Sequence, residues 1–235
     1  MLLKGARLQA RIVQFAQIAL LAGMGLAPLL LSAASAVAAG PTANPGSPLD
    51  PALESASADA RYAVRWVMAQ GDNQGLPFVI VDKKSARMFV FEANGRLRGA
   101  SPALLGLTPG DHSIPGIEQR EVASLRADER TTPAGRFVSE PGRNLQGEAI
   151  VWFDYAAKLA IHRLRPAPRS ERRPERLASA TPDDNRISMG CVVVPVSFYE
   201  TVVSPVLGKS YGVVYVLPEA QPVQHMLGAL LVSRQ

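Results

Sequence analysis

A chain of 235 residues is long enough for one sizeable domain with a full core and a leader. Its formal net charge is +5, but three of the positive charges lie in the first 39 residues, and without that segment the net charge is +2. This modest charge, with the export signal described next, argues against a nucleic-acid partner. The single cysteine excludes an internal disulfide, so Cys191 is free, paired with another chain, or reactive.

The first 39 residues have the pattern of a secretory signal peptide. Three basic residues begin the segment, residues 18–31 are an apolar run, and Ala36-Val37-Ala38 provides a small-x-small cleavage site. The pattern predicts a periplasmic protein whose mature form starts near Ala39 or Gly40. The alternative is an uncleaved leader that anchors the chain in the membrane, because the apolar run with its flanks is long enough for a marginal span.

A linker and a helix are expected in residues 40–76. Residues 40–48 are rich in Pro, Gly, Ser and Asn, which is typical of a flexible linker. Asp50 is a suitable N-cap and Pro51 suits the first helical position. Apolar residues then recur at helical spacing as far as Met68, and Gly71 offers a stop. We expect this helix to pack on the flank of the domain that follows.

From Pro77 onward the pattern changes to short apolar runs separated by Gly, Pro and Asn. Asn94-Gly95 is a strong hairpin signal between the second and third of these runs. Short strands with few long helical runs predict a mainly β domain, sandwich or barrel-like, over residues 77–218. The predicted strands are 78–81, 87–91, one near Leu97, 135–139, 149–153, 159–162, 192–194 and 212–217.

Two further segments have helical character. A helix from about Ser197 to Val203 is expected to end before Pro205, because proline cannot continue the hydrogen-bond ladder. Residues 219–235 form a C-terminal tail, and the sequence leaves open whether its apolar part, Pro222 to Val232, forms a short docked helix.

Cys191 lies in the segment Ser188-Met189-Gly190-Cys191, which an apolar run follows. A cysteine attacks an electrophile as the thiolate and therefore needs a nearby base and hydrogen-bond donors for the oxyanion. Gly190 permits a close backbone approach, and the amides around Gly190 and Cys191 are candidate donors. The competing interpretation is that a lone cysteine beside three valines is a small buried hydrophobic residue.

The chain has three histidines. His162, at the end of a predicted strand, is the best placed as a base, and its imidazolium is expected to lower the pKa of Cys191. Asp111-His112 suggests half of a metal site, but no matching cluster of His, Cys and acidic residues accompanies it, so a solvated loop histidine is expected. His225 is expected at the surface or in packing.

Three motifs together resemble the L,D-transpeptidase catalytic domain (YkuD-type). In that family a histidine is followed, after a spacer, by Ser/Thr-His-Gly-Cys, and here His162 is followed by Ser188-Met189-Gly190-Cys191. Upstream, the segment from Arg130 to Phe137 is similar to the family's Thr-Pro-x-Gly-x-Phe segment. The motifs occur in the family's order, and the resemblance covers about Phe78 to Leu217.

Three features depart from the family pattern. Met189 stands where the motif usually has a second histidine, and Val193 stands where a polar residue often follows. The spacer between His162 and Cys191 is also longer than in most members. Because methionine cannot donate a hydrogen bond, any part of that second histidine in substrate binding is lost or reassigned. The nucleophile and base positions are intact.

The resemblance implies a periplasmic cysteine acyltransferase that acts on peptidoglycan tetrapeptide stems. Cys191 would form a thioester, His162 would act as base, and Gly190 with Cys191 would hold the oxyanion, with no metal or organic cofactor. A second stem would resolve the thioester and give a cross-link, whereas water would make the protein an L,D-carboxypeptidase or amidase that trims the wall. The apolar Met189 and Val193 favour a third reading, a non-catalytic peptidoglycan-binding protein.

The spacer after His162 is strongly basic. Residues 163–176 carry six arginines against two glutamates, a charge of +4 in fourteen residues. Such runs are usually solvated surface. Because this segment joins the candidate base to the candidate nucleophile, it must lie beside any site they form, and arginine binds carboxylates bidentately. The candidates for substrate binding are therefore Arg169, Arg172 and Arg173, together with Arg186 and Ser188 of the cysteine segment.

Overall fold

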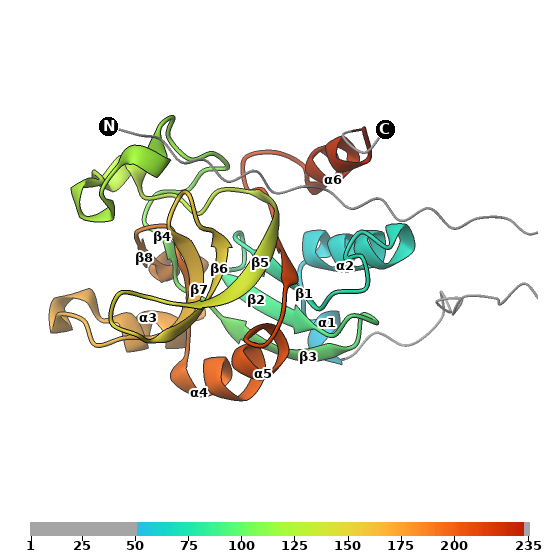
Figure 1. Cartoon of the computed structure of the whole chain (residues 1–235), viewed down its shortest axis with the longest axis horizontal. Helices are drawn as coiled ribbons and strands as arrows, with labels where there is room; N and C mark the ends of the chain where they lie inside the picture. Colours follow the sequence, from blue (N-terminus) through green and yellow to red (C-terminus); the bar gives the residue numbers. More distant parts are fainter. Residues whose placement is uncertain (1–50, 233–235) are drawn as a thin grey trace, which may run out of the picture. The chain divides into compact units, whose positions relative to one another are not determined.

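The structure is a computed structural model and describes residues 51–232. Ten strands in this part of the chain form two sheets (Figure 1). The larger sheet has the strand order β3-β2-β1-β10-β5-β6-β7-β9, and β4 pairs with β8 in parallel. The predicted signal peptide, the linker and Asp50 lie outside the described residues. The strands are β1 (Phe78–Asp82), β2 (Arg87–Phe91), β3 (Leu97–Pro102), β4 (Leu105–Gly106), β5 (Gly135–Arg143), β6 (Ala149–Asp154), β7 (Leu159–Arg163), β8 (Arg186–Ser188), β9 (Val192–Val194) and β10 (Gly212–Val216).

The eight-stranded sheet is bent so that its two halves face one interior. Val79 and Met88, from β1 and β2, share a buried core with Ile161 of β7 and Val192 of β9, although the two pairs of strands stand at opposite sides of the strand order. This arrangement confirms the prediction of a mainly β, barrel-like domain.

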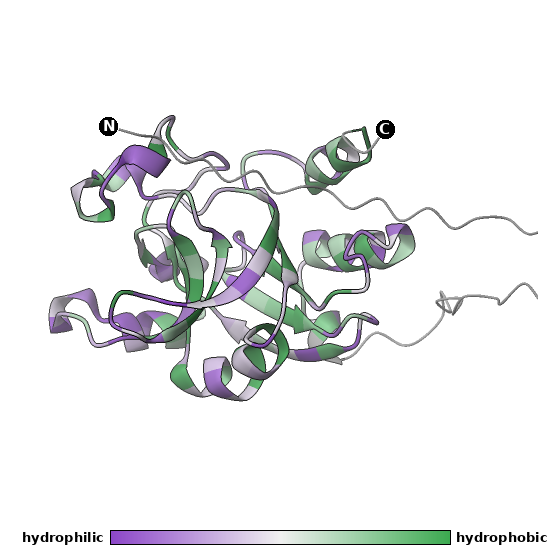
Figure 2. Ribbon diagram, in the orientation of Figure 1, coloured by the Kyte–Doolittle hydropathy of each residue, from purple (hydrophilic) through white to green (hydrophobic). Residues whose placement is uncertain are grey.

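Helices cover the outer face of β1, β2 and β10. Residues on that face pack against α2 (Ala58–Gln70) and α6 (Val223–Val232), and the Phe78 and Phe91 rings stack with centroids 4.7 Å apart. Because these strands are buried on both faces, they are apolar along most of their length, with charged residues only at Asp82, the end of β1, and Arg87, the start of β2 (Figure 2). The tail segment that the sequence left open is thus a docked helix, held by Val223 and Leu227.

The single helix expected near residue 51 is in fact two. The short α1 (Pro51–Glu54) ends before Ser57, whose hydroxyl oxygen accepts the amide of Ala60 at 3.1 Å and caps α2. The break occurs because a serine at this position competes for the first free amides of a helix. The stop at Gly71 is confirmed, since that residue has a left-handed φ of 58°.

The helix predicted to stop before Pro205 continues past it, so that prediction is wrong. α4 (Val196–Phe198) passes through a π-helical turn (Tyr199–Val203) into α5 (Ser204–Leu207). The Ser204 amide donates to the carbonyl of Tyr199, five residues back. The wider turn lets the chain stay helical as it enters Pro205, which has no amide hydrogen to give.

The long spacer between β7 and β9 is a crossover connection. β7 and β9 pair in parallel, and parallel neighbours need a connection that returns across the sheet. Here it consists of a 3-10 turn (Arg169–Glu171), α3 (Arg173–Ala178), a second 3-10 turn (Pro182–Asn185) and β8. Leu177 of α3 packs with Leu104 and Val193, so the crossover covers one face of β9.

No helix among residues 51–232 is long and apolar enough to cross a membrane.

Candidate active site

A tight turn presents Cys191 at the start of β9. The Ser188 hydroxyl donates to the Cys191 carbonyl at 2.6 Å and accepts the Gly190 amide at 3.0 Å. Gly190 has a φ of 126°, and a Cβ there would lie 2.8 Å from both Leu159 and the Thr131 carbonyl oxygen. Only glycine fits this position, because any side chain would be strained and would collide with its neighbours.

The register of β7 and β9 places His162 and Cys191 on one face of the sheet. Ile161 pairs with Val192 and His162 pairs with Val193. Val192 points into the barrel core, whereas Val193 packs on the opposite face, where Cys191 also packs. Since side chains alternate along a strand, His162 shares the face of Cys191 and is offset from it by about 7 Å along the strands. No hydrogen bond joins these two described side chains.

A backbone carbonyl fixes the tautomer of His162. Nδ1 lies 2.8 Å from the carbonyl oxygen of Arg163, and because a carbonyl only accepts, Nδ1 carries the proton in this contact. The lone pair of the neutral ring is then on Nε2. Burial lowers the pKa of His162 to about 4, although the hydrogen bond to the Arg163 carbonyl by itself raises it. The imidazole is therefore a neutral base at pH 7.

The thiol of Cys191 is also neutral at rest. Loss of hydration raises its pKa above the ordinary value, and a hydrogen bond from the Ala160 backbone and, to a smaller extent, the positive charge of Arg165 oppose the rise. Sγ contacts the carbonyl oxygen of Lys158 at 3.8 Å. The expectation that an imidazolium lowers the pKa of Cys191 is therefore wrong, because both groups are desolvated and each favours its uncharged form.

Cys191 lines a narrow cavity of about 20 Å³, which is room for about one water molecule. Met189 and the β6–β7 turn form one side. The other side comes from the segment with three 3-10 turns, Ile117–Gln119, Val122–Ser124 and Ala127–Glu129. Met189 thus lines the same cavity as Cys191, at the position where the resemblance leads one to expect a histidine.

Two of the predicted substrate residues are engaged within the fold. Arg186 pairs with Glu219 at 2.5 Å and donates to the Lys83 carbonyl at 3.0 Å. Ser188 is buried and uses its hydroxyl to shape the cysteine turn. Both residues therefore hold the cysteine segment from within the protein.

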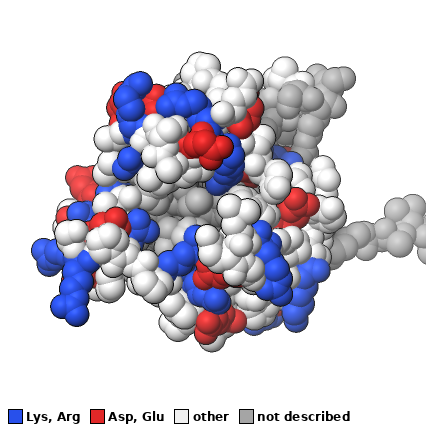
Figure 3. Space-filling model, turned by 60° about the vertical axis from the view of Figure 1, so that its left-hand side comes forward, with Lys and Arg blue, Asp and Glu red and all other residues white. Residues whose placement is uncertain are grey.

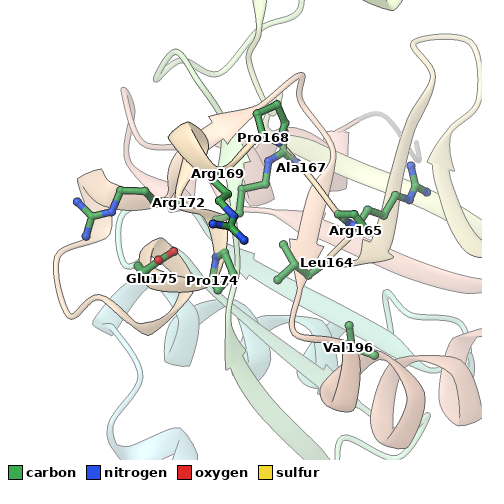
Figure 4. A pocket seen from close by; sticks show the side chains of 11 residues that line it. Leu164, Arg165, Ala167, Pro168, Arg169, Arg172, Pro174, Glu175 and Val196 are labelled. Carbon is green, nitrogen blue, oxygen red and sulfur yellow. The ribbon is translucent and has the colours of Figure 1, made fainter.

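The other three predicted substrate residues line the pocket shown in Figure 4, a space of about 570 Å³. The guanidinium of Arg169 points toward Pro174 and Leu164, whereas the side chain of Arg172 extends away from them. Neither Arg169 nor Arg172 has an ion pair among the described residues, while Arg173 pairs with Glu171. Leu164 lies two residues beyond His162 on the same face, so the pocket opens at the end of β7 away from Cys191.

Sequence reasoning missed three residues around the thiol. Lys158 donates through Nζ to the carbonyls of Glu118 and Arg120, which fastens the 3-10 segment beside the cavity. Arg165 affects the charge state of both His162 and Cys191. Thr132 bonds to the cysteine turn. Thr132 had a signal in the segment similar to the family's Thr-Pro-x-Gly-x-Phe, and Arg165 had one in the basic run 163–176, whereas Lys158 had none.

In the Asp111-His112 loop, Asp111 is hydrogen-bonded within the fold and His112 faces solvent. Asp111 accepts hydrogen bonds from Lys83 and from the amides of Glu219 and Ala220, whereas His112 is exposed. Among the described residues no group of three or more His, Cys, Asp and Glu side chains is arranged to hold a metal ion. On the face in Figure 3, basic groups are interleaved with acidic ones.

Solved structures similar to this chain include L,D-transpeptidases and a helical cell shape determining protein. The L,D-transpeptidase of Xylanimonas cellulosilytica matches at 16% identity and a TM-score of 0.39, over 60% of this chain and 60% of that one. The catalytic domain of the E. faecium L,D-transpeptidase matches at 17% identity and a TM-score of 0.35, over 60% of this chain and 95% of that one. The helical cell shape determining protein Pgp2 from Campylobacter jejuni matches at 16% identity and a TM-score of 0.38, over 72% of this chain and 62% of that one.

The chain thus spans less than two thirds of the length of the first of these proteins. No family model matches the chain, and no curated protein matches it in sequence.

The low pKa of His162 predicts a loss of stability in mild acid. The unfolded chain binds a proton near pH 6.5 and the folded chain only near pH 4, so stability is fully present above pH 6.5 and falls as the pH drops toward 4. We expect a loss of about 3 kcal/mol across this window. Urea unfolding at several pH values should show the loss in wild type and in the exposed-loop control His112→Gln, but not in His162→Gln. Equal losses in all three would contradict the assignment.

Proposed function

We propose that this chain is an exported cysteine acyltransferase of the L,D-transpeptidase type that acts on peptidoglycan stem peptides. The observation that supports it best is the placement of His162 and Cys191 on one face of adjacent parallel strands, with Nδ1 of His162 held by the Arg163 carbonyl. A cysteine with a purely structural role needs neither a base on the same face nor a fixed tautomer.

In the proposed reaction Cys191 attacks the carbonyl of the bond between diaminopimelate and the terminal D-alanine of a tetrapeptide stem. Because the thiol is neutral at rest, Nε2 of His162 accepts its proton as the sulfur attacks, directly or through one water. His162 then gives this proton to the leaving D-alanine, and a thioester remains on Cys191. The side-chain amine of a second stem displaces the thiol and forms the cross-link.

The oxyanion of the tetrahedral intermediate needs a donor close to the sulfur. The Gly190 amide is already bonded to Ser188. The Cys191 amide, in contrast, donates no hydrogen bond among the described residues, which makes it the available donor. Such a donor contributes about 3 kcal/mol to the stability of the transition state.

The arginine pocket is proposed to hold the anionic donor stem. It begins at Leu164, four residues beyond the level of Cys191 on β7, which corresponds to roughly 13 Å along the strand. A stem peptide that lies along this face can present its attacked carbonyl to Cys191 and a carboxylate to Arg169. The proline and leucine walls of the pocket suit the aliphatic parts of such a peptide.

Export is proposed from the leader alone, through cleavage after the Ala36-Val37-Ala38 site and release into the periplasm.

Two alternatives share the same scaffold. Resolution of the thioester by water would make the protein an L,D-carboxypeptidase or amidase. The narrow cavity and the raised pKa of Cys191 favour a non-catalytic peptidoglycan-binding protein, since both oppose attack by the thiol at rest. The retained base with its fixed tautomer favours the enzyme.

Mass spectrometry of muropeptides incubated with the purified protein separates these outcomes. We expect cross-linked dimers and free D-alanine with wild type and neither product with Cys191→Ala, which changes little volume in the fold. Trimmed monomers without dimers would identify the hydrolase. If Cys191→Ala forms products at the wild-type rate, the proposed nucleophile is wrong.

Replacing Arg169 and Arg172 together by Gln should raise KM for tetrapeptide stems about three- to tenfold and leave the reactivity of Cys191 toward iodoacetamide unchanged. The reason is that a single exposed ion pair contributes little binding energy, whereas an arginine that binds a carboxylate through two hydrogen bonds also fixes its orientation. Arg173 stays in place because it pairs with Glu171 and its charge reaches His162.

A double change of the exposed Arg65 and Arg96 to Gln is the control with equal loss of charge. Equal KM values for the two double variants at low ionic strength would show that the arginine segment is solvated surface with no part in substrate binding.

A further inference from the structure

The hydroxyl of Thr132 holds the peptide group that precedes Cys191. Its Oγ1 donates to the carbonyl of Gly190 at 2.9 Å and accepts the amide of Gly106 at 2.8 Å. Because the Gly106 amide is the donor in the second contact, the hydroxyl's own proton goes to Gly190. Thr132 is fully buried, so bulk water cannot take over either bond.

This hydrogen bond sets the direction of the Cys191 amide. A trans peptide group is planar, with its C=O and N–H on opposite sides. Holding the Gly190 carbonyl against Thr132 therefore turns the N–H of Cys191 away from Thr132. The left-handed glycine at 190 has freedom to rotate this peptide, so its orientation depends on an outside contact.

A buried charge network fixes Thr132 in turn. Nζ of Lys83 donates to the Thr132 carbonyl at 3.0 Å and pairs with Asp111 at 2.9 Å, and the Lys83 side chain is completely buried. The same lysine pairs with Glu219 at 3.4 Å, which also binds Arg186 just before the cysteine turn. The turn is thus held at both ends by one network, through Arg186 and through Thr132.

We propose that Thr132 is a positioning residue that aims the Cys191 amide at the oxyanion during acyl transfer. The inference rests on the proposed function in one respect, that Cys191 forms an acyl intermediate. Thr132 touches neither the substrate nor the sulfur in this scheme and acts only through the Gly190–Cys191 peptide.

Two thiol reagents distinguish positioning from a general structural role. With p-nitrophenyl acetate the sulfur attacks a carbonyl, an oxyanion develops, and p-nitrophenol leaves while the acetyl group stays on Cys191. With iodoacetamide the sulfur displaces iodide at a saturated carbon, and no oxyanion forms. Loss of the hydroxyl should therefore slow acylation and spare alkylation.

The experiment compares the ratio of the acylation rate to the alkylation rate in wild type, Thr132→Val and Thr132→Ser. We expect the ratio to fall at least about tenfold in Thr132→Val and to stay near wild type in Thr132→Ser, which keeps the hydroxyl. Thr201→Val is the control, because its hydroxyl bonds only to the Ser197 carbonyl on an exposed helix. If Thr132→Val does not fold, Thr132→Ala replaces it.

An unchanged ratio in the variant without the hydroxyl would overturn the inference, as would a parallel fall of both rates with a lower Tm. Neither reagent requires peptidoglycan, so the ratio tests Thr132 even if the protein proves inactive on stem peptides. Inactivity on stems with a selective effect of Thr132→Val would contradict the proposed substrate and leave the positioning role standing.

Discussion

The parallel pairing of β7 with β9 is the constraint on which the site depends. It brings His162 and Cys191, far apart in the sequence, onto adjacent strands with their side chains on one face. Parallel pairing requires a crossover, and the basic segment is that crossover. The position of the arginines beside the site therefore follows from topology, and α3 in the same segment seals the face through Leu177.

Burial gives this site a neutral resting state. Desolvation lowers the pKa of His162 to about 4 and raises that of Cys191, so each group keeps its uncharged form at pH 7. Acyl transfer from such a pair needs proton transfer during the attack, with no preformed ion pair to draw on. Such a reaction would therefore depend on how the groups are placed. The Arg163 carbonyl fixes the tautomer of His162, and the Thr132 hydroxyl holds the peptide group that carries the Cys191 amide.

Features that depend on neighbouring residues in the chain could be predicted from the sequence, whereas features that depend on tertiary contacts could not. Apolar runs and the Asn94-Gly95 turn predicted the strands, and the motifs predicted that His162 and Cys191 belong together. The pairing of Arg186 with Glu219, the inward hydroxyl of Ser188 and the π-helical turn before Pro205 depend on partners distant in the chain or on packing. The charge states of His162 and Cys191 depend on burial, which residue identity alone does not reveal.

Mass spectrometry of the intact protein can detect the acyl intermediate that we propose on Cys191. The protein is mixed with a tetrapeptide stem, quenched in acid within seconds, and digested to locate any adduct. We expect an added mass equal to the tripeptide acyl group, on Cys191 only and released by hydroxylamine, in wild type but not in Cys191→Ala. D-alanine released with no adduct at Cys191 at any time, or an adduct at another residue, would contradict it.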